Sequence, residues 1–160
     1  MNMECEDQLE LIPFKSVSFG SMSVQIHEPD EIQEAQLGYS VDPDSNSLVT
    51  DEEGSWKQNW LVIGYEDLCG DPIFVDTSVE GCPVYTAMHG TGSWNPILIA
   101  SSIESFAKAL EIISMRGKGR ENPVELESNP LPSGERADAL REIQRENPNA
   151  DMGFWQDWLG

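Results

Sequence analysis

Residues 59–88 read NWLVIGYEDLCGDPIFVDTSVEGCPVYTAM, and this stretch decides the fold. It holds three short apolar runs, at 60–65, 73–75 and 84–88, which are rich in β-branched and aromatic side chains that suit a pleated sheet. Turn sequences separate the runs, GDP at 70–72 and EGCP at 80–83. The pattern therefore predicts three consecutive strands of a meander, and these strands form the core of the sheet.

The flanking segments extend this sheet and supply helices. Alternating apolar residues over 14–27 predict two short strands or one bulged strand, and a further strand is expected at 37–41. Residues 97–100 form either a short strand or an extended lead-in to the next helix. Helical patterns follow at 30–35, from Ile103 to about Met115, and at 135–146. We expect a capping box at the start of the second of these helices, in which Glu104 reaches back to the N-cap.

The fold class that follows is α+β, a twisted, largely antiparallel sheet with helices packed against it. We expect residues 1–160 to form a single domain. Residues 118–133 are rich in Pro, Asn and charge and predict a linker. The tail ADMGFWQDWLG at 150–160 concentrates aromatic side chains, so we expect it to dock on the body of the protein.

The charge is strongly negative, with 29 acidic and 9 basic residues and a formal net charge of -20. Residues 1–54 dominate it, because they hold 13 acids and only one base, Lys15. Such a surface repels nucleic-acid phosphate and anionic lipid, so we expect neither nucleic acid nor membrane as a partner. It favours a cationic partner, although a general role in solubility is the alternative.

The three cysteines, Cys5, Cys69 and Cys82, are odd in number and have no CxxC spacing. This count argues against a disulfide framework and for a reducing compartment, with Cys69 and Cys82 as buried thiols. The acidic N-terminus has no basic segment followed by an apolar run, so neither a signal peptide nor a membrane span is predicted. We therefore expect a cytoplasmic protein.

Few sequence motifs indicate a catalytic or metal-binding site. The acidic loop over 42–54 matches a calcium-binding loop only in part, because Ser47 replaces the required glycine. No metal or cofactor is therefore expected. Asp71 and Asp76 flank a predicted strand and should point to opposite faces. A hydrolase that uses His89 with Asp71 or Asp76 is the least favoured hypothesis, and we expect no enzyme.

Two motifs resemble the SUKH superfamily, in its SMI/KNR-like branch. The first, WxxxWLVIGYExLCGDPIFVD, runs from Trp56 to Asp76, and the second, PVYTAMHGxGSWxPxLIAxS, from Pro83 to Ser102. With the helix that follows, the resemblance covers about residues 37–110, and a C-terminal helical extension spans 118–160. The family's Leu-Pro-x-x-Tyr-x-x-Phe string near the start has no counterpart here.

The resemblance implies an inert domain that binds proteins. Bacterial members are largely immunity proteins that neutralise toxins, often nucleases, and fungal members regulate cell-wall synthesis. We expect the first role, with a cognate toxin as partner, and a regulatory or scaffold protein is the alternative. The residues that match the motifs and are expected to hold the fold are Trp56, Trp60, Gly64, Gly70, Asp71, Pro72, Asp76, Gly90, Trp94 and Pro96.

The expected contact surface is acidic, because nuclease toxins are commonly basic. The residues that we expect to bind the partner are Asp30, Glu31, Glu34, Asp42, Asp44, Asp51, Glu52 and Glu53. The alternative is that these carboxylates only solvate the N-terminal side of the domain.

Overall fold

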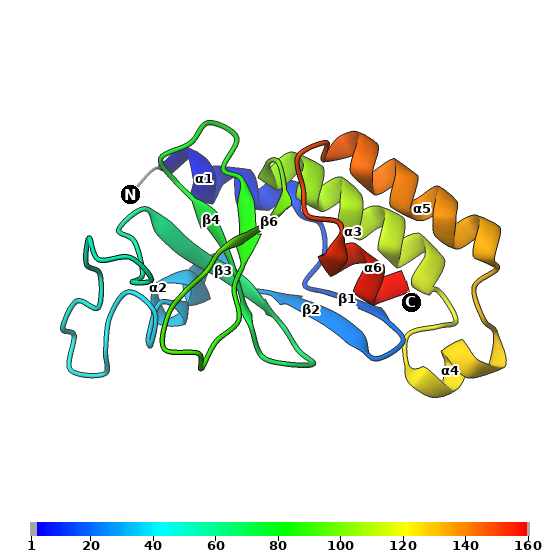
Figure 1. Ribbon diagram of the computed structural model, residues 1–160, viewed down its shortest axis with the longest axis horizontal. Helices are drawn as coiled ribbons and strands as arrows, with labels where there is room; N and C mark the ends of the chain where they lie inside the picture. Colours follow the sequence, from blue (N-terminus) through cyan, green and yellow to red (C-terminus); the bar gives the residue numbers. More distant parts are fainter. Residues whose placement is uncertain (1–2, 160) are drawn as a thin grey trace.

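A curled, six-stranded antiparallel sheet is the centre of the computed structural model, which describes residues 3–159 (Figure 1). Each strand pairs with the next one along the chain. The strands are β1 Ser16–Phe19, β2 Met22–Ile26, β3 Trp60–Glu66, β4 Pro72–Asp76, β5 Val84–Thr86 and β6 Ile97–Ala100. The predicted α+β class and the central meander are confirmed.

Different elements cover the two faces of this sheet. One face contains the main core, to which α1, α3, α5 and α6 contribute, and α5 packs beside α3 (Figure 1). The other face holds a smaller aromatic core beneath α2 and the neighbouring loops. The helices are α1 Met3–Gln8, α2 Ile32–Ala35, α3 Ile103–Gly117, α4 Pro123–Ser128, α5 Ser133–Glu146 and α6 Gly153–Leu159, with 3-10 turns at Leu9–Leu11 and Pro29–Glu31.

The aromatic tail docks on the body of the protein, as predicted. Trp155 and Trp158 are buried in the main core, and the Trp155 indole N–H donates to the backbone carbonyl of Ile99 over 2.8 Å. The backbone N–H of Asp151 donates to the carbonyl of Leu98, also over 2.8 Å. The tail therefore hydrogen-bonds to the backbone of β6, which is an edge strand of the sheet.

The strand predicted at 37–41 is wrong. Only an isolated bridge joins Leu37 to Val41, and Gly38 turns the chain in the left-handed region at φ +89°. The adjacent Gln36 side chain makes the two backbone hydrogen bonds that a neighbouring strand would make. Its amide accepts from the N–H of Val62 and donates to the carbonyl of Val62, both over 2.9 Å. One side chain thus protects a part of β3 that lies beyond the end of β2.

The capping box of α3 is also built differently from the prediction. The helix begins at Ile103, so its third residue is Ser105 and not Glu104. The Ser102 hydroxyl accepts from the N–H of Ser105, and the Ser105 hydroxyl accepts from the N–H of Ser102, each over 3.0 Å. Two serines therefore satisfy two free backbone donors, and the Glu104 side chain is not needed.

The segment predicted as a linker over 118–133 contains α4. Asn122 caps this short helix, because its side-chain oxygen accepts from the N–H of Glu125 over 2.9 Å. Pro123 occupies the first helical turn, where the missing N–H costs nothing. The asparagine–proline pair was a usable signal for this helix start, although the surrounding composition is typical of a linker.

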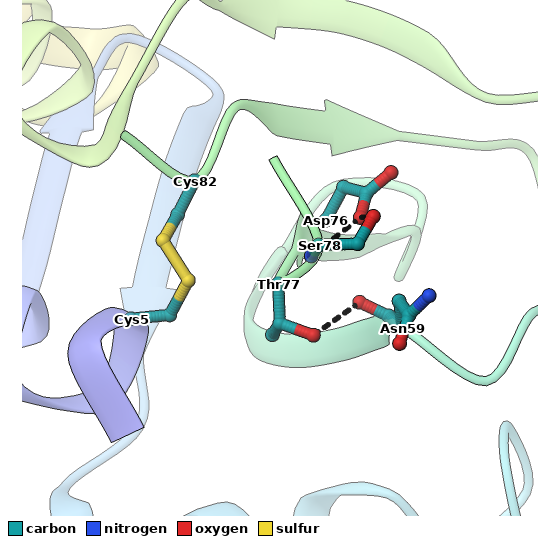
Figure 2. The surroundings of a disulfide bond; sticks show 6 residues. All are labelled: Cys5, Asn59, Asp76, Thr77, Ser78 and Cys82. Carbon is teal, nitrogen blue, oxygen red and sulfur yellow. Dashed lines mark hydrogen bonds between the residues drawn. A yellow bond between two sulfur atoms is a disulfide. The ribbon is translucent and has the colours of Figure 1, made fainter. Parts of the chain in front are cut away.

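The cysteine prediction is wrong as well. Cys5 of α1 and Cys82 of the β4–β5 turn form a disulfide with their Cα atoms 5.9 Å apart (Figure 2), and both residues are buried. Cys69, expected to be buried, is an exposed free thiol. Stable disulfides are typical of oxidising compartments, so the number of cysteines no longer supports the expected cytoplasmic location.

Replacing Asn147 by Ala is expected to lower the free energy of unfolding by about 2 kcal/mol, because three hydrogen bonds in the interior are lost. The fully buried Asn147 side chain accepts from the N–H of Ser101 over 2.8 Å and donates to the carbonyls of Ile143 and Ser105. It thereby fastens the end of α5 to the start of α3. Urea unfolding measures the loss, and the exposed Asn149→Ala variant is the matched control, expected to change stability by less than about 0.5 kcal/mol.

Candidate functional site

All eight acids predicted to bind a partner lie between β2 and β3, in residues 30–53, which we call the acidic excursion. It includes the turn before α2, α2 itself and a long succession of loops. Figure 1 shows these loops in cyan at one end of the molecule, with α4 at the opposite end. The eight acids therefore belong to one continuous segment, whose loops lie at one end of the molecule.

Two of these acids also serve the local structure. The Asp42 carboxylate accepts from the backbone N–H groups of Asp44 and Asn46, over 2.9 and 2.8 Å, and from the side-chain amide of Asn46. The hydrogen bond from the Asn46 backbone is the largest cause that holds the pKa of Asp42 below its usual value. Glu31 accepts from the N–H of Glu28 over 2.7 Å and so closes the turn before α2.

The other acids of the acidic excursion project into solvent: Asp30, Glu34, Asp44, Asp51, Glu52 and Glu53 are all exposed. Within residues 3–159, no lysine or arginine forms an ion pair with any acid of the acidic excursion. The ammonium group of Lys57, the nearest base along the chain, instead donates to the backbone carbonyls of Thr50 and Glu52. The carboxylates of this region therefore face outward without a direct ion pair in the described part of the chain, although Lys57 lies against the loop and Lys15 interacts electrostatically with Glu31 and Asp30.

An aromatic cluster ties the acidic excursion to the sheet. The Tyr39 ring lies 5.2 Å from that of Trp56 and 5.6 Å from that of Trp94, measured between ring centroids. Trp56 is fully buried against Phe74 of β4, at a centroid distance of 4.7 Å. The backbone N–H of Trp94 also donates to the carbonyl of Gly54 over 2.7 Å. These contacts thus hold the acidic loop over 42–54 against the aromatic core.

The residues that match the family motifs lie at turns and in the aromatic core. Gly70 and Gly90 adopt the left-handed backbone region, and Asp76 accepts from the N–H of Ser78 over 2.9 Å. Trp60 packs edge-on against Trp56. Pro72 opens β4, Pro96 directly precedes β6, and Gly64 lies in β3 against the backbone of β2.

The structure brings together only one of the two pairs considered for a hydrolase. The His89 ring nitrogen Nδ1 lies 2.7 Å from the Asp71 carboxylate, which also accepts from the N–H of His89 over 3.1 Å. Asp76 is at the opposite end of β4 and is engaged with Ser78. In the described chain, no hydrogen bond joins the His89 ring to a serine or cysteine, and the Asp71 carboxylate orients the imidazole.

Cys69 lies close in sequence to this pair, but its chemistry is unfavourable for nucleophilic catalysis. The charge of the Glu66 carboxylate, followed by desolvation and the charge of Asp71, raises the pKa of the exposed Cys69 thiol. A raised pKa lowers the thiolate fraction, and the thiolate is the reactive form. The arrangement therefore differs from a cysteine–histidine active site.

A search of residues 3–159 finds no group of three or more His, Cys, Asp or Glu side chains placed to hold a metal ion, the partial calcium-loop match included. Over the same residues, every helix is too short or too polar to cross a bilayer. Comparisons of the chain with protein-family models, with curated proteins and with solved structures find no match.

Proposed function

We propose that this protein is a non-enzymatic immunity protein that captures a basic protein toxin, such as a nuclease, through the acidic excursion. The resemblance to SUKH proteins suggests the class of function. The observation that supports it most is the set of six exposed carboxylates on anchored turns, none of which forms an ion pair with a lysine or arginine within residues 3–159.

This surface has the physical properties of a steering site. Carboxylates on one projecting region add their potentials and attract a positively charged partner before contact, which raises the association rate. Anchoring by the Tyr39–Trp56–Trp94 cluster reduces the entropy that must be lost on binding. The exposed Leu37 and Leu48, 49% and 40% accessible, supply apolar area within the same region.

Replacing Asp44, Asp51, Glu52 and Glu53 together by their amides is expected to slow association with the partner about tenfold at low ionic strength. The midpoint of thermal unfolding should change by less than about 2 °C, because all four side chains are exposed. The partner is first isolated from the native cell by affinity capture, and stopped-flow fluorescence then measures its association with each purified variant.

The matched control removes the same amount of charge from another part of the molecule. The control replaces four exposed glutamates that lie in α3 or after it in the chain, Glu111, Glu121, Glu127 and Glu135. Their quadruple glutamine variant should slow association by less than twofold. The proposal is overturned if the captured protein is acidic, or if both quadruple variants associate at the wild-type rate in dilute buffer.

A further inference from the structure

A groove of about 540 Å³ lies between α6 and the turn that joins β3 to β4. It belongs to the helix-covered face of the sheet, because Glu66 is paired with Val24 and Thr86 with Ile73, and directly opposite residues share a face. The groove is therefore an outward continuation of the main core, at the point where helical cover is incomplete.

Large apolar side chains are concentrated in this groove. Leu68, Met88 and Ile97 all line it, and they are 59%, 65% and 42% exposed. The half-buried Phe154 ring of α6 lies on the opposite wall. Exposed apolar groups that gather in one concave site, and are not scattered singly, are typical of a binding surface.

The charged side chains that line the groove are all acidic. Glu66, Asp71, Asp151 and Asp157 line it, and no lysine or arginine does. Glu66 is only 5% exposed, and within residues 3–159 its carboxylate accepts from the N–H of Cys69 alone, over 2.9 Å to one oxygen and 3.3 Å to the other. No cation contacts it within residues 3–159. A buried carboxylate without a counter-ion is unfavourable, and an incoming ammonium or guanidinium would supply one.

We propose that this groove binds a segment of a partner protein in which lysine or arginine residues are interspersed among large aliphatic residues. The aliphatic residues cover Leu68 and Met88, while the methylene stem of the basic residue lies on the apolar floor. Its charged end then reaches Glu66 and Asp157. The groove shares no residue with the acidic excursion, so this inference goes beyond the proposed function and stands without it.

The test uses a capped peptide of sequence LKLLK, titrated into the isotope-labelled protein and followed by amide chemical shifts. Saturable shifts are expected at Glu66, Leu68, Met88 and Phe154. Two control peptides, LQLLQ and GKGGK, should each bind at least tenfold more weakly, because one lacks the charge and the other lacks the apolar area.

Variants of exposed residues complete the test without disturbing the fold. Asp157→Asn and Leu68→Ser should each weaken binding of LKLLK about fivefold, whereas Glu127→Gln and Val124→Ser on α4 should leave it unchanged. The quadruple amide variant of the acidic excursion should retain at least half of the affinity, which separates this site from the proposed one. Absence of saturable binding, equal binding of LQLLQ, or insensitivity to both groove variants overturns the inference.

Discussion

Loss of the Cys5–Cys82 disulfide is expected to lower the free energy of unfolding by about 4 kcal/mol and the midpoint of thermal unfolding by about 12 °C. The two cysteines are 77 residues apart in sequence, so the disulfide closes a long loop in the unfolded chain and reduces its entropy. In the folded chain it fastens α1 to the turn between β4 and β5 (Figure 2). Reduction should therefore favour the unfolded ensemble and release α1 from the core.

The measurement compares thermal unfolding with and without a reductant. The wild-type protein and the Cys69→Ala variant should both be destabilised by the reductant, because Cys69 is outside the disulfide. The Cys5→Ala/Cys82→Ala variant should be unstable from the start and should not respond. As a direct count, alkylation of the denatured, unreduced protein should modify one thiol and alkylation after reduction should modify three. Three modified thiols without reduction would show that the disulfide is not formed.

The sequence was most informative where local signals and the tertiary environment agree. The turns around Gly70 and Gly81 separate apolar runs of strand length, so the central meander followed from pattern alone. The burial of the α3 apolar stripe and of the aromatic tail was equally easy to predict, because each could be stable only with its apolar side buried.

The failures involve contacts between residues that are far apart in the chain. No local pattern shows that Cys5 meets Cys82, or that the Gln36 side chain replaces a strand beside Val62. The acids of the acidic excursion could be named from sequence because they cluster along it. The groove beside α6 could not be predicted from the sequence. It is formed by strand ends, the β3–β4 turn and α6, and these come together only in the folded chain.

Replacing Gly64 by Ala is expected to lower the free energy of unfolding by about 3 kcal/mol, the second large effect. Gly64 lies at an irregularity in the pairing of β3 with β4, and on its other side it pairs with Ile26 of β2. A methyl group at this position would come within 2.3 Å of the carbonyl oxygen of Gln25. That oxygen belongs to the backbone of a paired strand, so the contact is relieved only if β2 and β3 separate, and the hydrogen bonds between them would weaken.

The same chemical change at Gly134 provides the control. This glycine is in the first turn of α5 with no atom within 4 Å of an added methyl group, so Gly134→Ala should stabilise the protein by about 0.5 kcal/mol through helix propensity. Urea unfolding of the two variants beside the wild type gives both changes on one scale. If β2 and β3 leave no room for a methyl group, the free energy of unfolding must fall in Gly64→Ala and rise in Gly134→Ala. A Gly64→Ala variant as stable as the wild type would mean that these strands pack less closely than the structure shows, and the pairing register of β3 would then have to be revised.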